Sequence, residues 1–96
     1  MPVVIVAYDI SDDYKRDKVA KLLFSMGFER VQRSLYAARG GVEKARQVAA
    51  AIARLIDHET DRVDVIVVPE HYWRARLVVG NGTPPRERRP SGVLLA

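Results

Sequence analysis

An apolar, β-branched run near the start of the chain, followed at once by a carboxylate, constrains the fold more than any other feature. Val3 to Ala7 are apolar without interruption, and Tyr8 and Asp9 follow before the turn-forming residues 10–13. Such a run bounded by turn residues is typical of a buried strand. Side chains alternate along a strand, so Asp9 shares a face with every second residue of the run. At the end of an apolar row, a carboxylate needs a donor, a cation or a proton to replace its hydration.

Two amphipathic segments predict helices. The first runs from about Asp12 to Met26; Ser11 or Asp12 can cap it, and Gly27 fits the left-handed conformation that ends helices. The second runs from about Val42 to Asp57. Both segments carry apolar residues at the i, i+3, i+4, i+7 spacing that buries one stripe.

Three further segments read as extended. Glu29 to Ala38 and residues 62–69, the latter ended by its proline, predict strands. After them, His71–Trp73 predicts a turn of helix, and Arg74 to Val79 predicts an edge strand that ends at Gly80.

The length and the composition of the C-terminal end define the domain organisation. The 96 residues are enough for one domain, which we place at residues 1–80. Residues 81–96 predict a flexible tail, because residues 81–90 are rich in proline, glycine and charge. The apolar residues 92–96 either add a strand to a neighbouring sheet edge or stay unpaired.

The apolar pattern of the strands predicts a homodimer. Two helices can cover one face of a sheet, yet residues 3–8 and, apart from Asp64, residues 63–68 carry apolar side chains on both faces. Leaving roughly six such side chains in water would forfeit about 1.5–3 kcal/mol each. A second copy packed sheet against sheet about a two-fold axis would cover them. The alternative is that the C-terminal segment folds back over the open face.

The charge of the chain indicates which binding partners to expect, and its cysteine content indicates the cellular compartment. The net charge is +4, with twelve arginines against four lysines, which favours phosphate-bearing partners over membranes. No apolar stretch is long enough to span a bilayer, and the N-terminus lacks the layout of a signal peptide. The absence of cysteine suits a reducing cytoplasm, where we expect the protein.

Several motifs carry a resemblance to a known family. They are V-I-V-A-Y-D-I-S-D-D at residues 4–13, G-F-E-R-V-Q-R-S-L-Y at 27–36, V-I-V-V-P at 65–69, and V-V-G at 78–80. In this order and spacing the chain resembles the CRISPR-associated family of small ferredoxin-like endonucleases, the smaller of the two spacer-acquisition proteins. The resemblance covers about residues 1–80.

The resemblance implies an α+β fold. It is a ferredoxin-like βαββαβ domain with an antiparallel sheet, two helices on one face and an extra C-terminal strand that can pair with the partner protomer. This domain would form a sheet-to-sheet homodimer. Because that fold needs four strands, the run from Glu29 to Ala38 must be split near Gln32–Ser34.

The family's functional positions also have matches. Asp9 matches the catalytic aspartate, which binds a divalent metal, Mg²⁺ or Mn²⁺, opposite its twin in the dimer. Tyr8 matches the aromatic residue before it. The matches that imply nucleic-acid binding are Arg16, Lys18, Arg30 and Tyr36. Arg33 departs from the family pattern, which is commonly aromatic there. Arginines would hold the phosphodiester, and Tyr8 or Tyr36 would stack on a base or donate a proton.

Each of these residues could instead have a purely structural role. Asp9 could cap the amides of Ser11 and Asp12, and Arg16 could simply pair with Asp12. Further structural roles are helix capping by Asp12 and Asp13, packing by Tyr8 and Tyr36, a structural Ser34, and surface positions for His58 and His71.

Three functional hypotheses remain, of which the first two follow from the resemblance. The first is a metal-dependent endonuclease of RNA or DNA that acts in the spacer-acquisition stage of antiviral defence with an integrase partner. The second is a non-catalytic dimeric DNA-binding scaffold for that integrase. The third is a ferredoxin-like regulatory or RNA-binding module, although residues 62–68 lack the aromatics that an RNA-recognition sheet uses.

Overall fold

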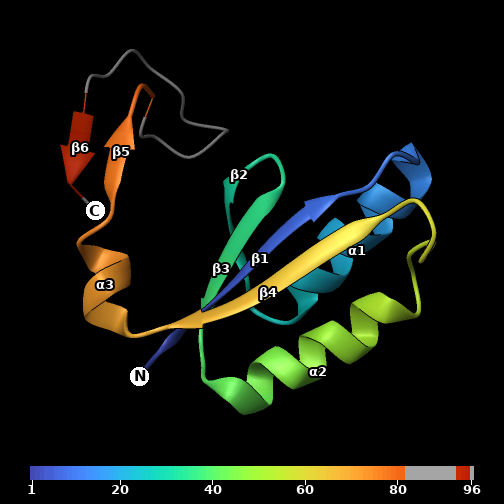
Figure 1. The fold of residues 1–96 in the computed structure, drawn as a ribbon, viewed down its shortest axis with the longest axis horizontal. Coiled ribbons are helices and arrows are strands. Elements are labelled where there is room, and N and C mark those ends of the chain that lie inside the picture. The colour runs from blue at the N-terminus through green and yellow to red at the C-terminus, as the bar shows by residue number, and fades with distance from the viewer. Residues whose placement is uncertain (82–92, 96) are drawn as a thin grey trace.

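The computed structural model of the protein describes residues 1–81 and 93–95 (Figure 1). Its elements are β1 (Val3–Asp9), α1 (Asp13–Ser25), β2 (Glu29–Gln32), β3 (Leu35–Arg39), α2 (Val42–Ala53), β4 (Arg62–Val68), α3 (Glu70–Arg74), β5 (Leu77–Val79) and β6 (Val93–Leu95). The first four strands form an antiparallel sheet in the order β2-β3-β1-β4. This arrangement confirms the predicted α+β ferredoxin-like βαββαβ fold.

A two-residue turn divides the segment that the sequence presents as one run. β2 ends at Gln32 and β3 begins at Leu35, with Arg33 and Ser34 in the turn between them. The pairing register also shifts between Arg30 and Gln32. The predicted split near Gln32–Ser34 is therefore confirmed, and the resulting hairpin forms one edge of the sheet.

Both long helices cover the same face of the sheet. β1 alternates as predicted, so Val4 and Val6 point into a core that is closed by apolar residues of α1 and α2. The residues from the two helices are Val19, Leu23, Ala45, Val48 and Ile52. This packing leaves Asp9 on the opposite, uncovered face of β1.

The ends of α1 follow the sequence signals. The Asp12 carboxylate caps the helix by accepting a hydrogen bond of 2.8 Å from the Lys15 amide. After the helix, Gly27 has φ +84°, and the amides of Gly27 and Phe28 donate to the carbonyls of Phe24 and Leu23. This is the Schellman arrangement, which requires the left-handed conformation at Gly27.

The uncovered face of the sheet stays largely open in one chain. Val3 is 3% exposed, but Ile66 at the middle of β4 is 45% exposed and pairs with Ile5 of β1. The side of the sheet opposite α1 and α2 therefore keeps aliphatic side chains in contact with solvent.

The segment after β4 differs in part from the prediction. The expected turn of helix at residues 71–73 is confirmed as α3, but that helix includes Arg74, so the following strand begins only at Leu77. β5 pairs with β6 in a separate two-stranded sheet (Figure 1). Neither strand covers the open face, as the alternative to a dimer would require. The predicted flexible tail falls mostly on residues 82–92 and 96, outside the described residues.

No helix in the described part of the chain is both long and apolar enough to cross a bilayer.

Candidate active site

A cleft of about 760 Å³ opens where β1 ends, and α1 and the β2–β3 hairpin supply its other walls. Its lining residues are Tyr8, Asp9, Ile10, Asp13, Arg16, Asp17, Ala20, Phe24, Arg30, Arg33, Ser34 and Tyr36. Five of the six predicted site residues are among them, and Lys18 is absent. The fold thus brings together side chains that are up to 28 positions apart in the sequence.

Asp9 presents an exposed carboxylate at the edge of this cleft. Its partner in the β-ladder is Arg62, but that guanidinium instead makes two hydrogen bonds of 3.1 Å to Asp64. Within residues 1–81 and 93–95, the Asp9 carboxylate makes no ion pair and no hydrogen bond, so the alternative in which it caps Ser11 and Asp12 is not observed. The carboxylate is free to meet a cation.

Arg16 holds the loop that follows Asp9. Its Nη1 donates to the carbonyl oxygens of Ile10 at 3.0 Å and Ser11 at 3.1 Å, and its Nη2 pairs with the Asp13 carboxylate. The alternative pairing with Asp12 is therefore wrong, because Asp12 is occupied as the helix cap. With three donors committed, this guanidinium fixes the backbone next to Asp9.

Tyr8 lies inside the cleft as a neutral phenol. Its hydroxyl donates to the Arg33 carbonyl at 3.3 Å, and its ring is 6.0 Å from the Tyr36 ring with an interplanar angle of 23°. Burial, followed by the hydrogen bond and charge of Tyr36, raises the pKa of Tyr8 to about 12 despite the opposing charges of Arg30 and Arg16. At neutral pH this hydroxyl can donate a proton or a hydrogen bond, but it cannot act as a base.

Tyr36 belongs to the core. It is 1% exposed, and its ring meets Phe24 edge to face, with the ring centroids 5.6 Å apart. The prediction that Tyr36 stacks on nucleic acid is therefore wrong in this structure, because the ring faces are not accessible. The packing role is the one observed.

The two arginines of the hairpin are the accessible cations of the cleft. Arg30 and Arg33 are both exposed, and in the described residues neither has an acidic partner. The Arg30 guanidinium makes only a weak contact of 3.4 Å, to the Arg33 carbonyl, within that part of the chain. Lys18 lies elsewhere, with its ammonium group 4.8 Å from the centre of the Tyr14 ring, so the structure does not bring it to the cleft.

Sequence reasoning missed one wall of the cleft. Asp13, Asp17, Ala20 and Phe24 line it from α1 and are spaced four, three and four residues apart. That spacing places side chains on one face of a helix. The signal is present in the sequence, but it is weaker than the apolar core stripe of the same helix.

The residues of one chain fit a divalent metal only in part. An exposed carboxylate oxygen such as that of Asp9 is a suitable ligand for Mg²⁺ or Mn²⁺. However, the described residues contain no group of three histidine, cysteine or acidic side chains that could hold an ion. One chain therefore offers an incomplete ligand set, which a symmetry-related Asp9 would extend.

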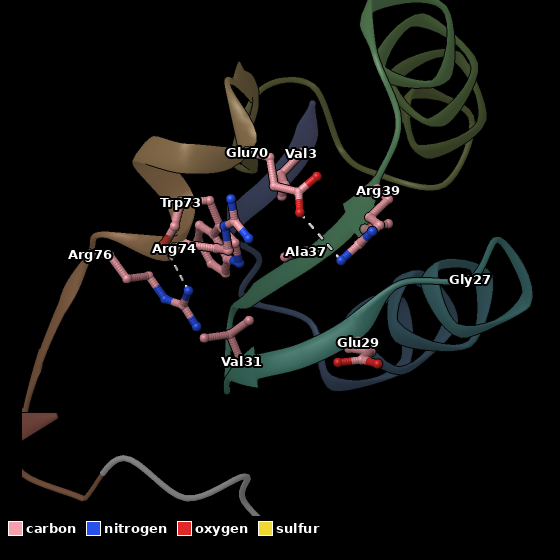
Figure 2. A pocket seen from close by; sticks show the side chains of 11 residues that line it. Val3, Gly27, Glu29, Val31, Ala37, Arg39, Glu70, Trp73, Arg74 and Arg76 are labelled. Atoms are coloured by element: carbon pink, nitrogen blue, oxygen red, sulfur yellow. Dashed lines mark hydrogen bonds and ion pairs between the residues drawn. The ribbon is translucent and has the colours of Figure 1, made fainter. Parts of the chain in front are cut away.

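A second hollow, of about 530 Å³, lies on the open side of the sheet between α3 and the hairpin (Figure 2). Figure 2 shows Arg39 facing Glu70, with which it forms an ion pair of 3.3 Å. Arg76 is also engaged, because its guanidinium stacks on Trp73 at 3.7 Å. Two of the arginines here are thus already partnered, and Asp9 does not line this hollow.

Comparisons with known proteins identify the family to which the chain is similar. Residues 1–76 match the family described as CRISPR associated protein Cas2. A protein of Aeropyrum pernix named CRISPR-associated endoribonuclease Cas2 is 48% identical over 69 residues, which cover 72% of this chain and 75% of that protein. A protein of the same name from Thermofilum pendens is 43% identical over 79 residues, covering 81% and 84% of the two chains.

Two solved structures share the fold. The hypothetical protein TT1823 of Thermus thermophilus superposes with a TM-score of 0.67 at 32% identity, over 93% of this chain and 96% of the other. Cas2 of Streptococcus pyogenes superposes with a TM-score of 0.69 over 81% and 99% of the chains, and at 23% identity it supports the fold alone. From the family match and the 48% identical relative, the chain belongs to the CRISPR-associated Cas2 family.

Proposed function

We propose that this protein is an endonuclease of the spacer-acquisition stage of CRISPR defence, hydrolysing phosphodiester bonds of RNA or DNA. The observation that carries the proposal is the free, exposed Asp9 carboxylate beside a cleft with two arginines that have no acidic partner among the described residues. The relatives named as endoribonucleases support the same activity.

The active form would be a dimer that places two Asp9 carboxylates near one another. Two such groups repel each other unless a proton or a cation lies between them. Together with water they could hold Mg²⁺ or Mn²⁺, and the small number of protein ligands would make the affinity weak and dependent on pH. When bound, such an ion would supply positive charge at the phosphate and lower the pKa of a nearby water.

The remaining residues of the cleft have separable roles in this proposal. Arg30 and Arg33 would bind the phosphates that flank the scissile bond. Hydrolysis breaks a P–O bond to the leaving oxygen, which then needs a proton; the neutral Tyr8 hydroxyl is suited to donate it. Arg16 would keep the loop after Asp9 in place without contacting the substrate.

The test is cleavage of labelled RNA and DNA by the Asp9→Asn variant, with Mg²⁺ and with chelator. We expect cleavage to be lost and binding to be retained. Asp17→Asn is the matched control, since it removes the same charge from the same cleft and should still cleave. Equal cleavage by Asp9→Asn and wild type would refute the proposal.

A second function is favoured by the incomplete ligand set of one chain. The protein would then be a dimeric DNA-binding scaffold for an integrase partner, and Asp9 would have no catalytic role. Wild-type protein that binds duplex DNA and a partner integrase, but cleaves nothing at any pH or metal concentration, would support the scaffold.

A regulatory or RNA-recognition module lacks support in the geometry. On the open face of β1 and β4, the described side chains are aliphatic, such as Ile5 and Ile66, or charged, such as Asp64, and none is aromatic. The tyrosines of β1 and β3 instead pack on the helix side. A sheet that reads RNA needs aromatic rings on its exposed face.

A further inference from the structure

Phe24 places an exposed aromatic ring in the cleft, and hydrolysis as proposed gives that ring no role. The side chain lies in the last turn of α1 and is 51% exposed, although its neighbours Val19 and Leu23 are fully buried. It touches the core through its edge-to-face contact with Tyr36. Leaving about half of a phenylalanine side chain in water forgoes part of the free energy that its burial would gain.

The charge around this ring suits a phosphate-bearing ligand. Two carboxylates that line the cleft are already paired, Asp13 with Arg16 and Asp17 with Lys21. Arg30 and Arg33 remain available from the hairpin wall. The cleft thus combines the exposed ring of Phe24 with two accessible guanidinium groups.

We propose that Phe24 is a stacking platform for one unpaired base, while Arg30 and Arg33 hold the adjoining phosphates. This combination of aromatic ring and cations is how proteins bind single-stranded nucleic acid. A base inside a duplex has both faces covered by its neighbours and cannot reach the ring. The ligand of the cleft is therefore a single strand, a loop or a frayed end. The inference rests on the proposed function, since it takes this cleft to be the nucleic-acid site.

The test measures binding by fluorescence anisotropy in the presence of chelator, so that no cleavage occurs. The probes are a short thymidine oligonucleotide and an abasic strand with the same number of phosphates. Wild type should prefer the thymidine strand. Phe24→Ala should weaken that binding by about 5- to 150-fold, the equivalent of 1–3 kcal/mol per stacked base. Binding of the abasic strand and the salt slope should not change, because no phosphate contact is lost.

Two further variants separate stacking from packing. Phe24→Trp should retain the preference for bases, and Phe24→Leu should lose it although it keeps an apolar side chain against Tyr36. Tyr14→Ala is the matched control, because Tyr14 is 67% exposed on the same helix but does not line the cleft. Its binding should equal that of wild type.

Each contrary result has a distinct meaning. Wild type that binds neither strand would refute the proposed function. Base-preferring binding that survives in Phe24→Ala or Phe24→Leu would overturn the stacking role alone and leave Phe24 for contact with a protein partner. Equal weakening of both strands by Phe24→Ala would also overturn it, since the ring would then act through the fold.

Discussion

At the residue scale, the cleft assigns different roles to side chains that look alike in sequence. Arg16 and Arg30 are both cations, but Arg16 donates to the backbone carbonyls of Ile10 and Ser11, while Arg30 is accessible. Tyr8 and Tyr36 are both aromatic, but Tyr36 is buried in the core. Hydrogen-bond partners and exposure decide which of them can meet a substrate.

Substitutions of Arg16 and Arg30 should differ in their effect on the salt dependence of nucleic-acid binding. Arg30→Ala should reduce the slope of log K against log salt by about 0.7 on a single strand, because one phosphate contact is lost. Arg16→Ala should leave the slope unchanged and lower kcat by about ten- to a hundredfold, because the Asp9 loop is no longer held. Arg46→Ala, on the exposed side of α2, controls for the loss of charge. An equal decrease in slope for Arg16→Ala and Arg30→Ala would refute this division of roles.

The raised pKa of Tyr8 should make the stability of the fold decrease at alkaline pH. Its pKa is raised to about 12 in the folded protein, mainly by burial, from an ordinary value near 10. The unfolded chain therefore loses this proton first, so the stabilising effect is full below pH 10 and is lost as the pH rises towards 12. At pH 8, Tyr8→Phe should cost about 0.5–1.5 kcal/mol for the hydrogen bond to Arg33.

Urea denaturation of both proteins at pH 8 and above pH 10 measures this effect. The difference between wild type and Tyr8→Phe should shrink as the pH rises. A constant difference over this range would mean that the Tyr8 hydroxyl ionises normally in the folded state, and a growing difference would mean that folding lowers its pKa; either result would contradict the raised pKa.

At the element scale, local signals predicted most of the fold. The cap at Asp12, the stop at Gly27 and the alternation of β1 depend on neighbouring residues only, and all three are confirmed. The boundary between α3 and β5 was misplaced, because Arg74 to Arg76 give no apolar period of their own. The β2–β3 turn could be inferred only from the four strands that the family fold requires.

The C-terminal signal of α1 can be tested at Gly27. An added Cβ would meet nothing closer than Lys44 Nζ at 4.0 Å, so the cost of a side chain there is conformational. Gly27→Ala should destabilise the fold by about 1–2 kcal/mol, because its φ of +84° suits only glycine and a few polar residues. Gly27→Asn is the control and should cost less. Denaturant midpoints measure both, and an Ala variant as stable as wild type would contradict the assignment.

At the scale of the whole molecule, the sequence could not predict which site side chains are exposed. It also could not predict which of them form ion pairs. Residues that meet at the end of β1 were identified through the family motif, and five of the six line one cleft. Their availability was not predictable, because the ion pairs of Arg16 and Arg62 depend on loop and ladder geometry. Lys18 and Tyr36 show that sequence position alone does not guarantee access.

The open face of the sheet should close in a dimer. Ile66 is 45% exposed near the middle of that face, and a charge there would be buried against its symmetry mate. We expect wild type to sediment at twice the mass of one chain at micromolar concentration, and Ile66→Glu to sediment as a monomer. Val42→Glu, at an exposed apolar position on α2, should remain dimeric. A monomeric wild type would refute the sheet-to-sheet interface.

The most direct test of the account is the number of Mn²⁺ ions bound per chain, measured by electron paramagnetic resonance. If Asp9 carboxylates from two chains share one ion, wild type should bind one Mn²⁺ for every two chains, and Asp9→Asn should bind none at this site. One ion per chain, or undiminished binding by Asp9→Asn, would contradict the shared site.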